Sequence, residues 1–155
     1  MKIEQATTND AAEILALQKL AYVSEAEIYD DFSIQPLTQT LDNLVRELAT
    51  HTTFKAVQEG RIVGSVRTLL DGGTCYVGKL IVHPEAQNQG IGSALMRHLE
   101  AFYPDAARFE LFTGHKSLRN LHLYTKLGYR EFKRVQVNDK VSLVYMEKHN
   151  QKGNP

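Results

Sequence analysis

The strongest constraint on the fold is the segment Leu80–Leu95, in which an apolar run is followed by a polar turn and two closely spaced glycines. The apolar run predicts the end of a buried strand, and the residues after Gly90 predict an amphipathic helix. Glycine at positions 90 and 92 lets another group approach the backbone closely. Because the first turn of a helix leaves N–H groups unpaired and carries partial positive charge, the segment predicts an anion site built from main-chain amides.

Other phosphate-binding loops fit this segment less well. The dinucleotide fingerprint needs glycine or alanine where Leu95 stands, and it needs a βαβ unit around it. The P-loop needs Gly-Lys-Ser/Thr, whereas Gly92 is followed directly by Ser93. A helix start whose glycines only permit a tight turn is the simple structural alternative.

The rest of the chain predicts one α+β domain. Strand patterns and turn signals give the order β-α-α-β-β-β-α-β-α-β-β, a mostly antiparallel central sheet of about seven strands flanked by about four helices. We interpret Pro36 as an interruption between the first two helices, Pro104 as the end of the third, and Gly128 as the C-terminal cap of the fourth. We expect the domain to cover residues 1–149 and residues 150–155 to form a flexible tail.

Composition excludes several classes of function. Lys plus Arg (18) equals Asp plus Glu (18), which argues against duplex nucleic acid as the main ligand. The histidines show no paired ligand spacing, so we expect no metal site. Cys75 is the only cysteine and is predicted to be a small buried residue rather than a nucleophile. Without an apolar leader or spanning segment, no membrane association is expected, and a cytoplasmic protein is the default.

In its wider context the glycine turn resembles a known family motif. Gln87-x-x-Gly90-x-Gly92, after a strand ending in Leu-Ile-Val-His-Pro, is similar to the Q/R-x-x-G-x-G/A motif of the GNAT superfamily of N-acetyltransferases. The resemblance implies acetyl-CoA as co-substrate, without a metal. It also implies that backbone amides bind the coenzyme A pyrophosphate and that the preceding strand pairs with the pantetheine arm. The cofactor contacts are then Leu80, Ile81, Val82, Gln87, Asn88, Gln89, Gly90, Ile91, Gly92 and Ser93. A backbone N–H near Leu80 or Ile81 would stabilise the thioester oxyanion.

A second motif follows at the spacing that the family shows. Ser117, Asn120 and Tyr124 are three and four residues apart, so a helix places them on one face. The resemblance implies that all three contact the cofactor and that Tyr124 is the general acid that protonates the departing thiolate. A buried tyrosine with a satisfied hydroxyl is the structural alternative.

The chain departs from the family pattern on the strand before the glycine turn. Many members carry a glutamate there as general base, but the stretch Cys75–Leu80 holds no carboxylate. Glu25, Glu27, Asp30, Tyr22 and ordered water remain candidates, and no spacing rule selects among them. Together with Asp31, the three acidic residues could face the acceptor and favour a cationic amine, or they could form a solvated helix end.

These observations favour direct acetyl transfer to a small-molecule or peptide amine in a ternary complex, and the resemblance also allows a homodimer. The alternatives are a non-catalytic acyl-CoA-binding regulatory module and, more remotely, a phosphate-binding module for another nucleotide. The acceptor stays open among a protein amino terminus, a lysine, a polyamine, an amino acid and an aminoglycoside. Residues 1–50, where the family builds acceptor specificity, match no motif.

Overall fold

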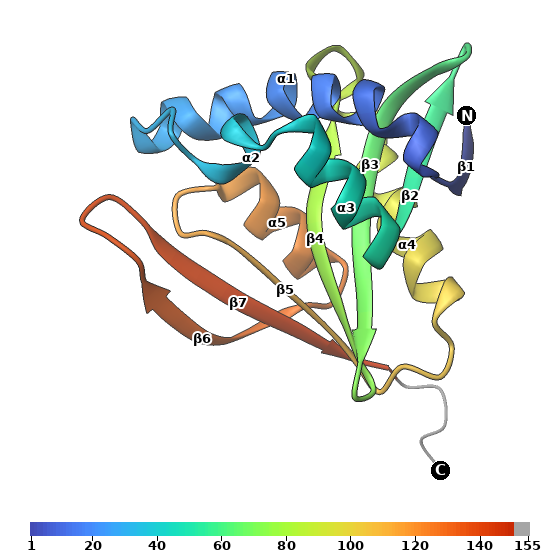
Figure 1. Cartoon of the computed structure of the whole chain (residues 1–155). Coiled ribbons are helices and arrows are strands. Elements are labelled where there is room, and N and C mark those ends of the chain that lie inside the picture. The colour runs from blue at the N-terminus through green and yellow to red at the C-terminus, as the bar shows by residue number, and fades with distance from the viewer. Residues whose placement is uncertain (151–155) are drawn as a thin grey trace.

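The computed structural model describes residues 1–150, which form a seven-stranded sheet with helices on both faces (Figure 1). The strands are β1 Lys2–Gln5, β2 Thr52–Gln58, β3 Arg61–Asp71, β4 Thr74–Val82, β5 Arg108–Gly114, β6 Arg130–Gln136 and β7 Ser142–His149, in the sheet order β1-β2-β3-β4-β5-β7-β6. The helices are α1 Ala11–Tyr29, α2 Gln35–Thr38, α3 Leu41–Thr50, α4 Ile91–Phe102 and α5 Leu118–Lys126, with 3-10 helices at Thr8–Asp10 and Pro84–Ala86. The predicted α+β architecture is confirmed.

One element differs from the prediction. Instead of about four helices, the described residues contain five α-helices, because the four-residue helix α2 forms around Pro36. Proline is tolerated there since it lies in the first turn, where its missing N–H would have no helical partner. The predicted helix ends at Phe102, before Pro104, and at Gly128, whose φ is 100°, are confirmed.

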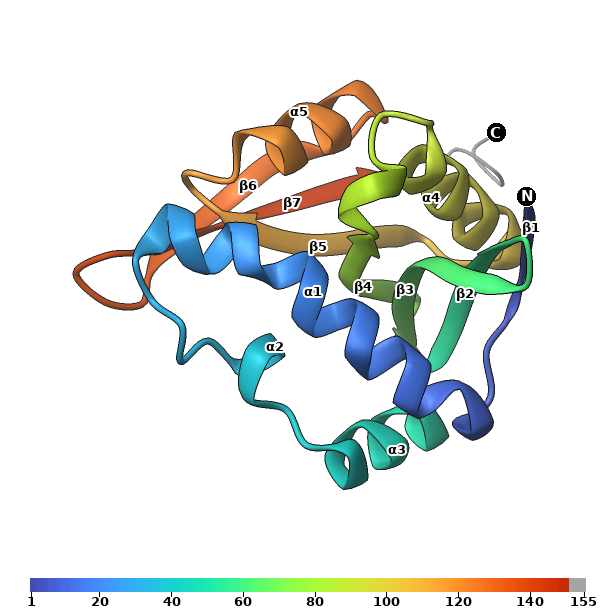
Figure 2. The same cartoon turned by 90° about the horizontal axis from the view of Figure 1, so that it is seen from above.

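Two hydrophobic clusters hold the helices to the sheet. On one face, α4 and α5 pack through residues such as Leu95, Leu99 and Tyr124. On the other face, α1 and α3 pack through residues such as Ile14 and Leu44. Figure 2 shows the sheet between these two layers of helices. The sequence therefore builds three layers, with the amphipathic faces of the helices buried on opposite sides of the sheet.

The central strands β4 and β5 separate partway along their length. They run parallel and pair only from Thr74 with Arg108 to Tyr76 with Glu110. Beyond this point β4 continues to Val82 and β5 to Gly114 without pairing to each other, and the two strands diverge in Figure 1. This separation opens the sheet next to the glycine turn.

A β-bulge lies in β4 at this opening. Ser65 pairs with Ile81 and Arg67 with Gly78, so the pair Lys79 and Leu80 stands opposite the single residue Val66. Lys79 adopts a left-handed φ of 48°. Because a bulge interrupts the ladder and reverses which face a side chain occupies, Lys79 reaches α3 while Leu80 packs on the α4 side.

The carboxyl end of the described chain is held by hydrogen bonds. The Asn150 side-chain amide donates to the carbonyls of Tyr103, Pro104 and Ala106, and its backbone N–H donates to Ala107. The remainder of the tail expected at residues 150–155 lies outside the described residues. Within residues 1–150, no helix has both the length and the apolar character that a membrane span requires.

Candidate functional site

A cavity of about 960 Å³ lies beside the separated strands. Its walls come from the second half of α1, the end of β4, the turn before α4, and the first part of α5. It is lined by every cofactor contact predicted from the sequence except Gln89 and Tyr124. The predicted residues therefore converge on one cavity, although they come from two segments, of which the first ends at Ser93 and the second begins at Ser117.

The turn before α4 presents unpaired amides to this cavity. Among residues 1–150, no hydrogen bond is donated by the backbone N–H groups of residues 88–93, and the first one after the turn runs from Ala94 to the Gly90 carbonyl at 2.9 Å. We call residues 88–93 the amide loop. Since these groups lie at the positive end of α4, the loop is suited to bind an oxygen-rich anion.

The two glycines of the amide loop have different structural roles. Gly90 has a left-handed φ of 79°, a conformation that glycine adopts without the steric cost that other residues incur. Gly92 packs tightly, because a Cβ placed there would lie 3.3 Å from Leu123 Cδ2 and 3.8 Å from Leu80 Cδ2. One glycine therefore shapes the turn, and the other lets α4 approach α5 and β4.

A cation that the sequence did not identify stands beside the amide loop. The Arg119 guanidinium, from the first turn of α5, donates a hydrogen bond to the side-chain oxygen of Gln87. Arg119, His122 and Lys126 all line the cavity. Sequence reasoning missed them because surface cations on a helix are common, although their spacing of three and four residues could have suggested a shared face.

Ser117 and Asn120 form part of the α5 wall. Ser117 is 2% exposed, and its hydroxyl donates to Glu25 Oε2 at 2.6 Å. The Asn120 side-chain amide donates to Thr113 Oγ1 at 3.3 Å. Both side chains line the cavity, so they are available to a bound ligand while they tie α5 to α1 and β5.

Tyr124 lies behind this wall, in the core between α5 and the sheet. Its side chain is buried, and within the described residues its hydroxyl makes no hydrogen bond. Burial raises the pKa of the Tyr124 hydroxyl well above its usual value, and the charges of Tyr22 and Glu25 raise it further. The phenol therefore keeps its proton at neutral pH, as a general acid must before it acts.

The acidic segment at the end of α1 divides into two parts. Glu25 and Glu27 line the cavity, but Asp30 and Asp31 do not. Asp30 follows the helix with a left-handed φ of 50°, and its carbonyl accepts a hydrogen bond from Lys140. Asp31 instead accepts hydrogen bonds from the backbone and hydroxyl of Ser33. The hypothesis that four carboxylates face one ligand is therefore wrong for half of them.

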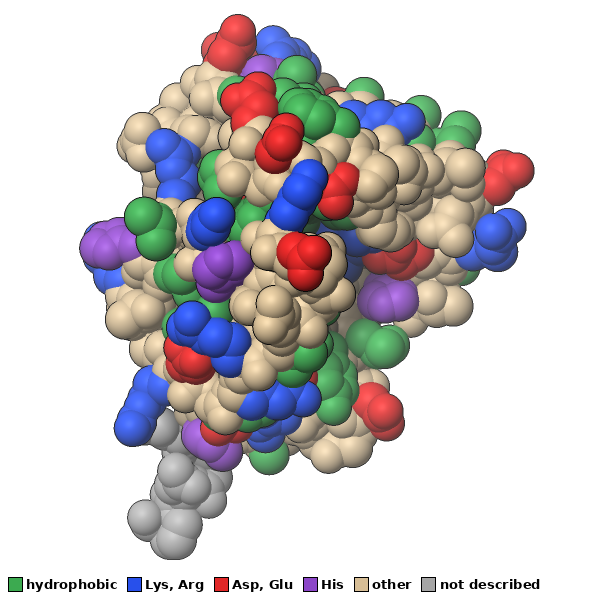
Figure 3. Space-filling model, turned by 90° about the vertical axis from the view of Figure 1, so that its left-hand side faces the viewer, with side chains coloured by type: hydrophobic (Ala, Val, Ile, Leu, Met, Phe, Trp, Pro, Cys, Tyr) green, Lys and Arg blue, Asp and Glu red, His purple; other side chains and the backbone are tan. Residues whose placement is uncertain are grey.

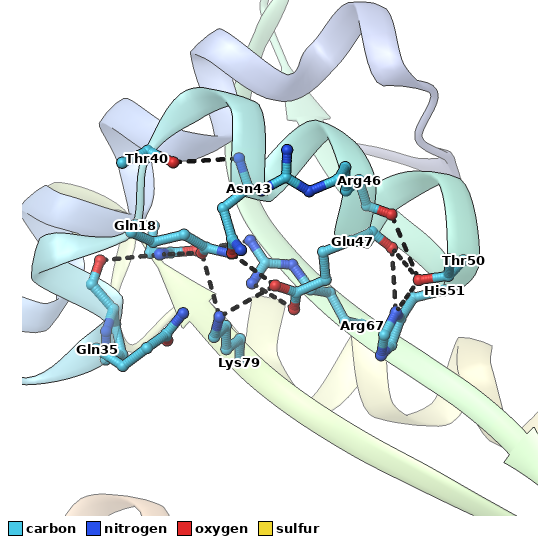
Figure 4. A network of polar contacts seen from close by, with 12 residues as sticks. Gln18, Gln35, Thr40, Asn43, Arg46, Glu47, Thr50, His51, Arg67 and Lys79 are labelled. Atoms are coloured by element: carbon cyan, nitrogen blue, oxygen red, sulfur yellow. Dashed lines mark hydrogen bonds and ion pairs between the residues drawn. The ribbon is translucent and has the colours of Figure 1, made fainter.

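A buried polar network lies on the opposite face of the sheet, under α3 (Figure 4). Arg67, only 2% exposed, contacts Glu47 Oε1 at 3.2 Å and donates to Gln18 Oε1 at 2.6 Å. Lys79 contacts Glu47 Oε2 at 3.4 Å. Gln39 bridges the set, since it accepts from Lys79 at 3.1 Å and donates to Glu47 at 2.6 Å. We call Gln18, Gln39, Glu47, Arg67 and Lys79 the buried polar network.

Electrostatics couple this network to the cavity through Tyr22. Tyr22 lines the cavity, and burial raises the pKa of its hydroxyl. The charge of Arg67 lowers this pKa, whereas the charge of Glu25 raises it. At Glu47, burial opposes ionisation, but Arg67 and Lys79 together hold the pKa of the carboxyl below its usual value. Glu47 is thus an ion-paired carboxylate whose oxygens are already engaged.

The other titratable candidates have structural roles. Cys75 is fully buried, and burial raises the pKa of its thiol to about 12, so the prediction of a small core residue is confirmed. Within residues 1–150, no three His, Cys, Asp or Glu side chains gather as metal ligands would.

On the face shown in Figure 3, positive and negative side chains are interspersed.

Comparison with known proteins agrees with this geometry. The family model described as "Acetyltransferase (GNAT) domain" matches residues 17–150. UPF0157 protein YqkA of Bacillus subtilis is 28% identical over 127 residues, which are 81% of this chain and 36% of that protein. This chain spans between 36% and 63% of the length of the curated relatives it matches.

Solved structures show the same fold at low sequence identity. The ribosomal-protein-S18-alanine N-acetyltransferase of Escherichia coli superimposes with a TM-score of 0.80 at 16% identity, over 96% of this chain and 93% of that one. The PaiA N-acetyltransferase of Thermoplasma acidophilum, solved with coenzyme A, gives a TM-score of 0.79 at 14% identity, over 96% and 99% of the two chains. With the family model matched over most of its length, the chain belongs to the GNAT family of acetyltransferases.

Proposed function

We propose that this protein is an acetyl-CoA-dependent N-acetyltransferase that transfers the acetyl group directly to a primary amine in a ternary complex. The observation that carries the proposal is the amide loop, whose unpaired N–H groups open onto the cavity at the start of α4. A diphosphate accepts charge-assisted hydrogen bonds from such groups without a lysine. Family membership and the structural likeness to a coenzyme A complex support the same co-substrate.

The rest of the cavity fits the remainder of acetyl-CoA. From the amide loop it continues past Leu80 and Ile81 to Ser117 and Asn120. There β4 does not pair with β5, so its free edge offers main-chain groups to an extended pantetheine arm, which would bind as an added strand does. The bulge at Lys79 and Leu80 takes main-chain groups out of the ladder, and we propose that an N–H at this point stabilises the thioester oxyanion.

We further propose that Tyr124 protonates the coenzyme A thiolate when it departs. The amine nitrogen forms a bond to the thioester carbonyl carbon, the C–S bond breaks, and the sulfur takes a proton from the phenol. The excess proton on the nitrogen then restores the phenolate to phenol. The raised pKa of Tyr124 supports this role, since it keeps the proton in place until thiolate develops nearby.

Coenzyme A binding and thiol release test the proposal separately. We expect coenzyme A, but not ATP, to raise the melting temperature. We also expect thiol release when acetyl-CoA is mixed with one of a panel of primary amines. Binding without release for any amine would favour the acyl-CoA-binding regulatory module. Absence of both would reject the proposal.

Tyr124→Phe tests the acid. We expect kcat to fall by about 100-fold, because general acid catalysis contributes on this order, while the affinity for acetyl-CoA stays within about threefold. Tyr103→Phe, which removes a hydroxyl that bonds to Thr68 outside the cavity, is the matched control. Equal turnover in Tyr124→Phe and wild type would remove Tyr124 from the mechanism.

A further inference from the structure

A chain of buried hydrogen bonds joins the end of α1 to the start of α5. Glu25 and Tyr29 lie one turn apart on the same face of α1. The Tyr29 hydroxyl is 2.7 Å from Ser117 Oγ, and Ser117 Oγ is 2.6 Å from Glu25 Oε2. The backbone N–H of Lys116 lies 3.0 Å from the Tyr29 oxygen.

The chemistry of its ends fixes the direction of this chain. A backbone N–H can only donate, so Tyr29 accepts from Lys116. An ionised carboxylate can only accept, so Ser117 gives its single hydroxyl proton to Glu25. The Tyr29 hydroxyl must therefore donate to Ser117. Every hydrogen points towards Glu25, and hydrogen bonds aligned in this way strengthen one another.

The surroundings of Tyr29 show that the protein is shaped around this chain. Tyr29 is 8% exposed and Ser117 is 2% exposed, so both are shielded from competing water. A Cβ on Gly114 would overlap the Tyr29 hydroxyl, so β5 makes room for it with a glycine. These buried neighbours, and the hydrogen bond from Ser117, orient the Glu25 carboxylate.

The carboxylate so held faces the cavity. Glu25 and Ser117 both line it, next to Leu80 and Ile81. Within residues 1–150, Ser117 is the one hydrogen-bond donor to Glu25, and it contacts Oε2, which leaves Oε1 available to a ligand. Glu25 also lies within electrostatic reach of Tyr22 and Tyr124, since its charge affects the hydroxyls of both.

The competing carboxylates are placed differently. Glu27 lines the cavity but is exposed and accepts no hydrogen bond from the described residues. Asp30 lies beyond the helix end and outside the cavity lining. Glu47 is occupied by Arg67, Lys79 and Gln39. Glu25 alone of these four is both oriented by buried neighbours and open to the cavity.

We propose that Glu25 is the general base for the acetyl acceptor and that Ser117 and Tyr29 are its positioning residues. The inference rests on the proposed function. Glu25 takes a proton from the acceptor ammonium, and the freed nitrogen lone pair attacks the thioester carbonyl. As the C–S bond of the tetrahedral adduct breaks, the Tyr124 phenol protonates the sulfur, and the remaining excess N–H proton passes to the phenolate and restores it to phenol. The products are the N-acetyl amine and coenzyme A, and Glu25 returns its proton to water.

The test compares Glu25→Gln with wild type from pH 7 to pH 9. The matched control is Glu27→Gln, the neighbouring carboxylate on the same cavity. The charged and titratable groups that line the cavity with Glu25 are Tyr22, Glu27, Arg119, His122 and Lys126. Tyr29 reaches Glu25 through Ser117, and Tyr124 lies within its electrostatic reach. Acetyl-CoA is supplied with spermidine, a lysine peptide or a peptide with a free alanine amino group, whichever releases thiol fastest with wild type.

We expect Glu25→Gln to lower kcat/KM about 100-fold at pH 7. With spermidine or the lysine peptide, whose amines have a pKa near 10, the rate of Glu25→Gln should rise about tenfold per pH unit, so that the difference from wild type narrows. With the alanine peptide, whose amino group has a pKa near 8, the rise should level off above about pH 8. Ser117→Ala and Tyr29→Phe should show a smaller loss of kcat/KM with the same pH dependence. Coenzyme A affinity of Glu25→Gln should stay within about threefold of wild type, and Glu27→Gln should match wild type.

A loss in Glu25→Gln that is equal at every pH, or one caused by weaker coenzyme A binding, would overturn the inference and leave the proposed function standing. The same holds if Glu27→Gln, and not Glu25→Gln, shows the pH-dependent loss. If wild type binds coenzyme A but releases no thiol with any of the three amines, the proposed transfer fails, and the inference fails with it.

Discussion

The two faces of the sheet handle charge in different ways. The amide loop offers partial positive charge from main-chain N–H groups, and its pattern is contained in the six residues 88–93. The buried polar network on the other face uses full charges on side chains from α3, β3 and β4, together with the neutral amides of Gln18 in α1 and Gln39 between α2 and α3. A local backbone site can be read from spacing, whereas a side-chain site depends on how distant elements meet.

The difference also predicts how each face responds to substitution. Substitutions in the amide loop should weaken ligand binding and leave the fold intact, because its amides are already unpaired. Substitutions in the buried polar network should lower the free energy of unfolding, because Arg67 is buried and depends on its partners. The four predictions below test this contrast, starting with the largest expected effect.

Glu47→Gln should give the largest change in the free energy of unfolding. It removes the carboxylate that faces Arg67 and Lys79 and leaves a buried guanidinium without its counter-charge. Breaking such a pair costs about 3 kcal/mol, which urea denaturation measures directly. Asp42→Asn, an exposed carboxylate in the first turn of the same helix, should cost less than about 1 kcal/mol. Similar losses in the two variants would contradict the contrast.

The pH dependence of stability checks the same pair. The folded-state pKa of Glu47 is lowered despite its burial, because Arg67 and Lys79 favour the charged form. A lowered pKa contributes stability above the ordinary value of 4.5, and this contribution is lost as the pH falls through the folded-state value. As the pH falls below 4.5, the free energy of unfolding of wild type should therefore decrease more than that of Glu47→Gln.

Ser93→Asp should weaken coenzyme A binding by about 100-fold, or about 2.7 kcal/mol, without unfolding the protein. A carboxylate in the first turn of α4 competes for the free amides and repels a diphosphate, yet it suits the positive end of a helix. Ser93→Asn has the same shape without the charge and should stay within about threefold of wild type. Calorimetric titration with coenzyme A distinguishes them, and equal affinities would exclude an anion site at this turn.

Arg119→Ala should give the smallest effect, a loss of coenzyme A affinity of about threefold to tenfold. Arg119 is exposed and contacts Gln87, so its charge near the amide loop is screened by solvent. Added salt should narrow the difference from wild type. Arg97→Ala, an exposed residue of α4 outside the cavity lining, should bind coenzyme A as wild type does. A larger effect for Arg97 than for Arg119 would place the anion elsewhere.

Most of the fold could be predicted from local signals. Buried side chains alternate with more exposed ones along β5, the helices α3 and α4 are amphipathic, and Pro104 and Gly128 end helices as expected. The short helix α2 could not be predicted, because its four residues carry too little periodicity to outweigh Pro36. Most of the predicted cofactor contacts line the cavity for the same reason, since they belong to one strand end, one turn and one helix face.

The sequence by itself determined the amide loop and the spacing of Ser117, Asn120 and Tyr124, because a turn and a helix face depend on residues a few positions apart. The tertiary structure alone decided which carboxylate of α1 is held at the cavity, because Glu25 and Ser117 are 92 residues apart in the chain. It likewise brought Glu47 to Arg67 and Lys79. A hydrogen bond or ion pair needs its atoms within a few ångströms, and the order of residues does not set that separation over long stretches of chain.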